Sequence, residues 1–219
     1  MDSDELIRRY PLLFHMTEAK AWPTIERLGL RSVTSLLDLF EIDGNLRWRL
    51  ESERRPHATT LRHPDHGDIV IRDQKPLNVD KLAACLTDMN VTDWLRVLNR
   101  KVFFWVGEHR VTELLAAQAY RGRAHIVLVV DTAALVTAYE AVITLAPINT
   151  GSTLYDPQPR GSDTLLQIAQ YPFEHWRRQR GTPKKAVAEL AVDYAVPDIV
   201  EQVIRVERRQ YGREPELVS

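Results

Sequence analysis

The segment Lys101-Val102-Phe103-Phe104-Trp105-Val106 is rich in aromatic and β-branched side chains and strongly predicts a strand. It is followed by an amphipathic helix expected over residues 110–120, with Gly122 as its stop, and by the apolar run 125–130, which is typical of a central strand. Further strands are expected at 142–145, 186–192 and 203–206. Because strands and helices alternate irregularly, we expect an α+β domain with a mixed sheet and flanking helices.

The part of the chain before this segment predicts shorter elements. Residues 10–16 indicate a first strand, and a helix is expected to begin near Pro23 and to end at Gly29. Residues 41–80 are rich in Arg, His, Asp and Pro and lack clear periodicity, so we expect an insertion or long loop with a short strand at 68–72. Other helices are expected around 36–40, 80–90, 92–99 and 164–180. We therefore predict a single domain over residues 1–219 that carries one insertion.

Composition bounds the class of protein. The chain has 219 residues, of which 44% are hydrophobic and 27% charged, as in ordinary globular domains. The formal net charge of −1 gives no global signal for a polyanionic partner, so a nucleic-acid site would have to be a local patch. The single cysteine, Cys85, excludes an internal disulfide. The acidic N-terminus resembles no signal peptide and no apolar run is long enough to span a membrane, so we expect a cytoplasmic protein.

Two residues stand out as candidates for chemistry. His15, in Phe14-His15-Met16-Thr17, ends the first predicted strand and is suited to bind a ribose hydroxyl, although a histidine satisfied within the core is the more common explanation. Glu189 lies in the otherwise apolar stretch 187–192, where a buried carboxylate without a partner is unfavourable. A functional glutamate and a solvent-facing glutamate on an edge strand explain this pattern equally well.

Other polar clusters favour ordinary explanations. The loop residues 149–152 and 160–163 are suited to wrap a phosphate-bearing ligand, but Asn, Gly and Ser dominate turns for local reasons. The basic run between His175 and Lys185, interrupted by Trp176, is suited to single-stranded nucleic acid, yet it is more often a solvated helix face. The histidines of residues 57–66 match no metal-ligand spacing, and Cys85 is expected in the core.

Several of these segments together resemble the DarT-like branch of the ADP-ribosyltransferase superfamily. The opening, a His-x-Thr strand followed by Trp22-Pro23-Thr24-Ile25-Glu26-Arg27-Leu28-Gly29-Leu30, is similar to the opening of that family. The aromatic strand at 102–105 resembles its second core element, and residues 185–200 resemble its catalytic strand. Most of the chain also resembles a family of uncharacterised bacterial proteins. The resemblance implies an ADP-ribosyltransferase-like fold.

The resemblance also implies an activity and a set of residues. NAD would be cleaved between nicotinamide and ribose, and ADP-ribose would be transferred to a macromolecule, for which DNA and RNA are the candidates, without a metal. Glu189 takes the position of the catalytic glutamate, and Arg110 is the candidate for the catalytic arginine. The predicted NAD-binding residues are His15, Met16, Thr17, Phe104, Tyr120 and Asn149. A bacterial toxin-like enzyme of this kind would have a neutralising partner protein.

Two departures from the family keep alternatives open. The Pro-Arg-Ser-type segment that carries the family's arginine is replaced after Trp105 by Gly107-Glu108-His109-Arg110, so Arg110 or Arg72 would have to substitute. Residues 41–80 have no counterpart in the family. The alternatives are a catalytically degenerate module that binds a nucleotide or nucleic acid, and an NAD-dependent RNA 2′-phosphotransferase.

Overall fold

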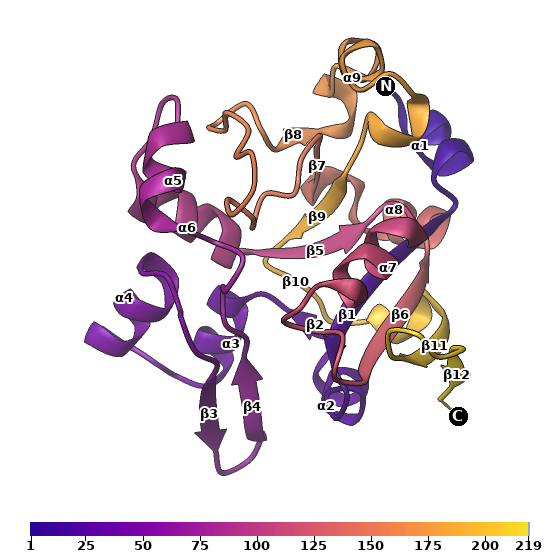
Figure 1. Ribbon diagram of the computed structural model, residues 1–219. Coiled ribbons are helices and arrows are strands. Elements are labelled where there is room, and N and C mark those ends of the chain that lie inside the picture. Colours follow the sequence, from indigo (N-terminus) through magenta and orange to yellow (C-terminus); the bar gives the residue numbers. More distant parts are fainter. Residues whose placement is uncertain (219) are drawn as a thin grey trace.

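The structure is a computed structural model that describes residues 1–218, and it is an α+β fold built on one large sheet (Figure 1). The strands in spatial order are β12 (Glu216–Leu217), β11 (Val203–Arg209), β6 (His125–Asp131), β1 (Leu12–Glu18), β5 (Lys101–Trp105), β9 (Glu189–Asp193), β7 (Ile143–Ala146) and β8 (Leu166–Gln167). The α+β class is confirmed. The sheet is antiparallel at each of these pairings, so the expectation of a mixed sheet is wrong.

The pairing of the strands becomes much less extensive between β1 and β5. Strand β1 pairs with β6 along its whole length, from Leu12 to Glu18, whereas it pairs with β5 only at Phe14 and Trp105. Strand β5 in turn pairs with all five residues of β9. The two groups of strands therefore meet at a single register position, and β5 and β9 cross the middle of the molecule beside β1 (Figure 1).

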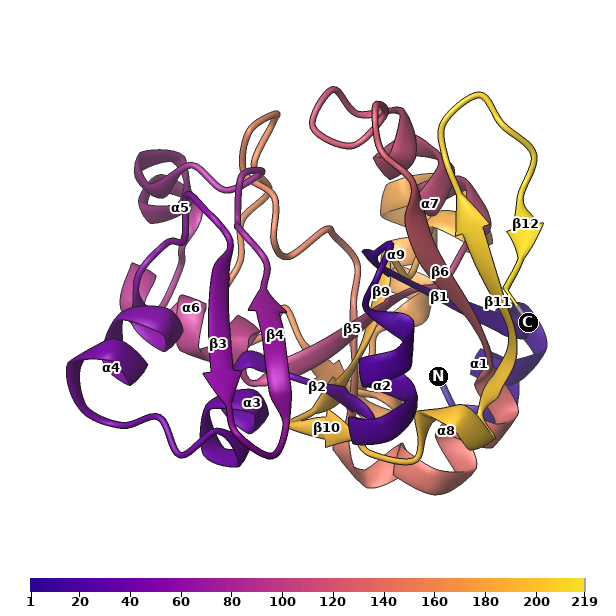
Figure 2. The same ribbon diagram turned by 90° about the horizontal axis from the view of Figure 1, so that it is seen from below.

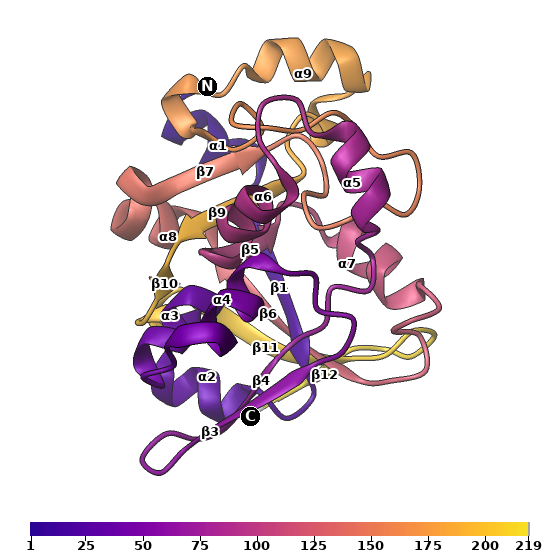
Figure 3. The ribbon, with the colours of Figure 1, turned by 90° about the vertical axis from the view of Figure 1, so that its left-hand side faces the viewer.

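Helices cover the sheet and also lie to one side of it. They are α1 (Ser3–Arg9), α2 (Trp22–Leu28), α3 (Val33–Leu39), α4 (Gly44–Ser52), α5 (Val79–Cys85), α6 (Val91–Asn99), α7 (Glu108–Ala116), α8 (Thr132–Tyr139) and α9 (Phe173–Arg180). Single 3-10 turns are η1 (Glu140–Val142), η2 (Ile168–Gln170), η3 (Pro183–Lys185) and η4 (Ile199–Glu201), and a two-residue ladder joins β2 (Leu30–Arg31) to β10 (Ala195–Val196). Helices α1 and α9 lie together at one end of the molecule (Figure 3).

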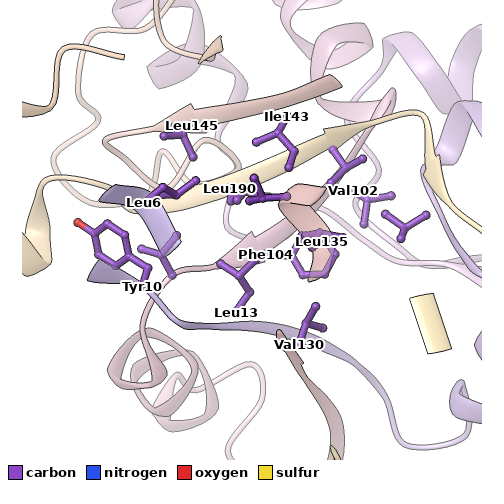
Figure 4. Packing of buried hydrophobic residues seen from close by; sticks show 14 of the residues in the cluster. Leu6, Tyr10, Leu13, Val102, Phe104, Val130, Leu135, Ile143, Leu145 and Leu190 are labelled. Atoms are coloured by element: carbon purple, nitrogen blue, oxygen red, sulfur yellow. The ribbon is translucent and has the colours of Figure 1, made fainter. Parts of the chain in front are cut away.

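The main core lies on one face of the strands. Alternate residues of β5 and β9, such as Phe104 and Leu190, pack with Leu6 of α1 and Leu135 of α8 (Figure 4). A second cluster on the other face of β1 joins Phe14 and Met16 to Val111 and Leu115 of α7. Burial of each aliphatic side chain stabilises the fold by roughly 1.5–3 kcal/mol. Because successive side chains point to opposite faces of a strand, the apolar residues of these strands form one core on each face of the sheet.

Residues 41–80 contain more regular secondary structure than the expected insertion or long loop with one short strand at 68–72. It contains α4 and a hairpin of β3 (Thr59–His63) and β4 (Gly67–Ile71). Leu50, Leu61 and Ile71 pack with Leu37 and Phe40 into a small core of their own. The segment lies beside α3 and α6, on the side of the molecule away from β11 and β12 (Figure 2).

Some predicted helix boundaries differ from those observed, and one is confirmed. The helix expected over 110–120 is α7, which ends at Ala116, four residues before Tyr120. The expected helix 164–180 contains β8 and η2 before α9 begins at Phe173. The cap at Gly29 is confirmed, since its amide donates to Ile25 O at 2.8 Å. No helix among residues 1–218 has both the length and the apolar character needed to cross a membrane.

Candidate functional site

Glu189 begins β9 and lies in the interior of the sheet. It pairs with Trp105 of β5 on one side and with Ala146 of β7 on the other. Only 4% of its surface is exposed. The interpretation of Glu189 as a solvent-facing residue on an edge strand is therefore wrong. A carboxylate in this position must be stabilised by hydrogen bonds, by nearby positive charge, or by protonation.

Thr150 supplies the hydrogen bonds. Its backbone amide donates to Glu189 Oε2 at 3.0 Å and its hydroxyl donates to the same oxygen at 2.7 Å. Burial nevertheless raises the pKa of Glu189 to about 7, against the lowering effects of Thr150 and of the charges on Arg110 and Arg160. The carboxyl group therefore titrates near neutral pH, as general acids and bases in active sites do.

The second carboxylate oxygen of Glu189 is not engaged in the same way. Within residues 1–218 the fully buried side-chain nitrogens and oxygens without a hydrogen-bond partner belong to Trp94, Arg110, His125 and Gln202. Glu189 Oε1 is not among these atoms, and it accepts no hydrogen bond from the described residues. It therefore keeps at least a small exposed area and is the carboxylate oxygen without a partner among the described residues.

Arg160 holds the turn that binds Glu189. This arginine is 2% exposed, and its Nη1 donates to Thr150 O at 3.0 Å and to Ser152 O at 3.2 Å. Its backbone is fixed against the end of α5, because Arg160 N donates to Cys85 O and Thr87 N donates to Arg160 O. A guanidinium with several fixed donors suits this role better than an ammonium. Arg160 thus positions Thr150, and Thr150 positions Glu189.

A cavity of about 320 Å³ opens beside this turn, between α7, the loop at 147–160 and the end of α9. We call it the arginine cavity, because its basic lining residues are His109, Arg110, Arg160, Arg180 and Lys185. Asn149 and Ser152, which flank the Glu189-binding turn, also line it. Its acidic lining residues are Glu113 and Asp156. The excess of cations makes the cavity suited to an anionic ligand.

Arg110 is the cation in this cavity that has a fully buried donor without a hydrogen-bond partner. Its Nε is buried and has no partner among the described residues, and its guanidinium carbon lies 6.0 Å from the ring centre of Trp105. Burial lowers the pKa of Arg110, while the charge of Glu189 opposes that shift. A desolvated donor without an acceptor is unfavourable. The Nη groups of Arg110 also make no hydrogen bond to the described residues, and they are not among the fully buried atoms, so they are the donors that can reach an oxyanion in the cavity. Arg110 and Asn149 are thus brought to the side of Glu189.

His15 and Thr17 lie in a different cavity, of about 440 Å³, which we call the histidine cavity. The two cavities share no lining residue. Along the register Phe14, Trp105 and Glu189, two strand spacings of ~4.8 Å place Glu189 roughly 10 Å from β1. His15 and Glu189 therefore belong to neighbouring parts of one sheet, but His15 lines the histidine cavity and Glu189 lines neither cavity.

The remaining predicted NAD-binding residues line neither cavity. Phe104 is 1% exposed and belongs to the main core, and Met16 packs in the second cluster against α7. Tyr120 is also part of that cluster, where Arg72 lies 5.4 Å from its ring centre. Their side chains are packing residues, so the assignment of these side chains to the cofactor is not supported.

The sequence placed Thr150 and Arg160 in a loop suited to wrap a phosphate-bearing ligand, with turn chemistry as the favoured explanation, but it did not connect either residue with Glu189. The sequence feature that could have indicated this role is an arginine in a loop of Gly, Ser and Asp, because the backbone carbonyls of a buried loop need hydrogen-bond donors.

Arg72, weighed as a substitute arginine, donates from Nη1 to Met16 O at 3.1 Å and lines the histidine cavity. His63 and His66 stack on each other at 4.5 Å beside Phe40.

Comparison with known proteins gives a family without an assigned activity. A comparison with curated proteins found no match. Residues 11–203 match the family model described as a family of unknown function, DUF7002. The match includes β1, β5, β9 and the whole segment 41–80, and it covers most of the chain. The protein therefore belongs to the DUF7002 family.

Proposed function

We propose that this protein is an NAD-dependent ADP-ribosyltransferase in which Glu189 acts on the ribose of NAD. The observation that carries the proposal is a buried glutamate with one oxygen held by Thr150, whose neighbours Asn149 and Ser152 line a cavity rich in cations. A second observation supports it. The three segments that resemble the DarT-like family lie on the adjacent strands β1, β5 and β9, which favours an ADP-ribosyltransferase-like fold.

The reaction breaks the bond between the nicotinamide nitrogen and the ribose. The bonding electrons leave with nicotinamide, and the ribose develops the positive charge of an oxocarbenium-like transition state. Ionised Glu189 stabilises that charge through Oε1, and a hydrogen bond from the ribose hydroxyl to this oxygen tightens as the charge grows. The acceptor then forms a bond to the ribose carbon and loses a proton, which Glu189 or solvent accepts.

The arginine cavity accounts for the phosphate groups in this proposal. The diphosphate of NAD carries negative charge, and Arg110, Arg180 and Lys185 are the cations that would bind it. The Nη groups of Arg110, which make no hydrogen bond to the described residues and are not fully buried, would donate to the diphosphate. Arg160 already donates to backbone carbonyls, so we assign it to positioning the turn rather than to NAD.

The arrangement also supports a second candidate, a protein that binds a nucleotide without cleaving it. Only 4% of Glu189 is exposed, and its pKa near 7 leaves a large protonated fraction at neutral pH. Both features would weaken catalysis without affecting a phosphate site made by arginines. The two candidates differ in whether nicotinamide is released.

The test is to incubate the protein with labelled NAD, with and without single-stranded DNA, RNA or cell lysate. Free nicotinamide and label carried by macromolecules are measured. We expect Glu189→Gln to lower release by on the order of 100-fold, the effect of removing one preorganised transition-state contact. The matched control is Glu26→Gln, a charge removal at an exposed residue of α2. NAD that stabilises the protein without any nicotinamide release would establish the binding-only candidate instead.

A further inference from the structure

The histidine cavity has the features of a ligand site independent of Glu189. Its volume of about 440 Å³ lies in the usual range for small-molecule sites. Helix α2 contributes Ile25 and Leu28 to its wall, and strand β4 of the hairpin contributes Ile69 and Ile71. Figure 2 shows α2 and the β3–β4 hairpin as the two elements that stand on either side of this space. The segment 41–80 therefore supplies one wall of the cavity.

Two polar groups on β1 face the cavity with unused capacity. His15 Nδ1 lies 2.8 Å from Phe103 O, and because a carbonyl only accepts, Nδ1 carries the proton and Nε2 is left as an acceptor. Thr17 Oγ1 makes no hydrogen bond to the described residues and is not one of their fully buried orphan atoms. Positions 15 and 17 share one face of the strand and lie ~7 Å apart.

The charged groups around the cavity are largely engaged already. Arg72 donates to Met16 O and lies 3.5 Å from Glu18, and Lys101 lies 3.4 Å from Asp193. Arg55 donates to the backbone oxygens of Leu50 and Arg72. Burial lowers the pKa of His15 to about 4, so its ring adds no charge at neutral pH. This cavity therefore contrasts with the arginine cavity, where Arg110 has a donor to spare.

We propose that the histidine cavity binds an uncharged, mainly apolar small molecule that donates an N–H or O–H to His15 Nε2 and places a second polar group against Thr17 Oγ1. The apolar body of the ligand lies between Ile25 of α2 and Ile69 and Ile71 of β4. The proposal does not depend on NAD cleavage, because none of the groups that bind Glu189 lines this cavity.

The test uses tryptophol, an uncharged indole with an N–H at one end and a hydroxyl at the other. Binding to the intact protein is followed by NMR of labelled isoleucine methyl groups. We expect saturable shifts at Ile25, Ile69 and Ile71, while Ile148 of the arginine cavity stays unmoved. Indoleacetate, which replaces the hydroxyl with a carboxylate, is expected to bind more weakly. The lining cations Arg31, Arg55, Arg72 and Lys101 are already engaged, and the remaining one, Lys20, is exposed to solvent, so its charge is screened by water.

Variants separate this site from the proposed active site. Thr17→Val, which keeps the side-chain shape, is expected to weaken tryptophol binding roughly fivefold, the effect of losing one hydrogen bond. Thr60→Val, at an exposed position of β3 that does not line the cavity, should leave the affinity unchanged. Glu189→Gln should also leave it unchanged. Shifts confined to Ile148, absence of saturation, equal affinity for indoleacetate, or no effect of Thr17→Val would each overturn the proposal.

Discussion

Thr150 donates twice to one oxygen of Glu189, through its amide at 3.0 Å and its hydroxyl at 2.7 Å. These bonds lower the pKa of a carboxyl group that burial raises to about 7. We expect Thr150→Val to remove the hydroxyl donor and raise the pKa of Glu189 further. The variant should lose roughly 1–3 kcal/mol of unfolding free energy, since a buried acceptor is left with one donor fewer. Denaturant unfolding and an NMR titration of the Glu189 carboxyl group measure the two effects. A pKa that falls or stays unchanged would contradict this account of the Thr150 hydroxyl.

The titration of Glu189 also predicts how stability depends on pH. Its pKa rises from an ordinary value of 4.5 to about 7 on folding, so the folded state binds the proton more tightly than the unfolded state does. The resulting stabilisation is fully present below pH 4.5 and is lost as pH rises through about 7. A pKa difference of this size corresponds to roughly 3 kcal/mol. Glu189→Gln cannot titrate at this position.

The difference in unfolding free energy between wild type and Glu189→Gln should therefore move in favour of the variant as pH rises from 4.5 to 7.5. Both proteins share all other titrating groups, so their difference isolates residue 189. Urea unfolding at several pH values supplies the measurement. Parallel stability curves for the two proteins would show that Glu189 has no raised pKa. If the proposed function holds, nicotinamide release should rise over the same pH interval, because the ionised carboxylate is the form that stabilises the ribose cation.

The hydrogen bonds from Arg160 to Thr150 O and Ser152 O can be tested by substitution. Arg160→Lys keeps the charge but cannot place several donors in one plane, so Thr150 O or Ser152 O loses its partner. We expect a loss of about 2 kcal/mol in unfolding free energy, and a larger loss for Arg160→Met. Arg178→Lys, at an exposed position of α9, is the matched control and should change stability by less than about 0.5 kcal/mol. Equal effects of the two lysine substitutions would mean that the arginine geometry is unimportant.

Close backbone packing at Gly29 gives a prediction about the fold itself. Gly29 has φ of 76°, and a Cβ there would lie 2.3 Å from Pro197 Cα. Gly181 has the same φ of 76° but no atom within 4 Å of such a Cβ. Gly181→Ala should therefore show only the backbone penalty of ~1 kcal/mol, whereas Gly29→Ala adds a steric clash with backbone and should lose at least ~3 kcal/mol. Thermal or urea unfolding compares the pair, and similar losses would contradict the close contact with Pro197.

The elements with a clear hydrophobic pattern could be predicted from sequence. The strands at 101–106 and 125–130 and the glycine cap at Gly29 have local causes, and their positions were close to those observed. Helix α4 was missed because only Leu50 and Ser52 are buried along it, which leaves no apolar stripe to detect. The candidate site was predicted through Glu189, since a lone carboxylate in an apolar strand is conspicuous. The contacts of Thr150 with Glu189 and of Arg160 with Thr150 could not be predicted, because they span 39 and 10 positions of chain and depend on how the long loop folds back.

Substitution of Arg110 is expected to weaken NAD binding while leaving the stability of the fold nearly unchanged. Arg110→Met keeps an unbranched side chain as far as the position of Nε but removes the guanidinium, whose carbon lies 6.0 Å from the ring centre of Trp105 and whose Nε has no partner among the described residues. In the absence of ligand, relief from desolvation offsets the lost attraction to Glu189, so unfolding free energy should change by less than about 1 kcal/mol. Under the proposed function the same change removes a charge-assisted hydrogen bond to the diphosphate of NAD, which should raise KM roughly 10- to 100-fold. Unfolding curves and NAD kinetics on the same preparation measure both quantities. A destabilised variant with unchanged KM would show that Arg110 serves the fold and not the ligand.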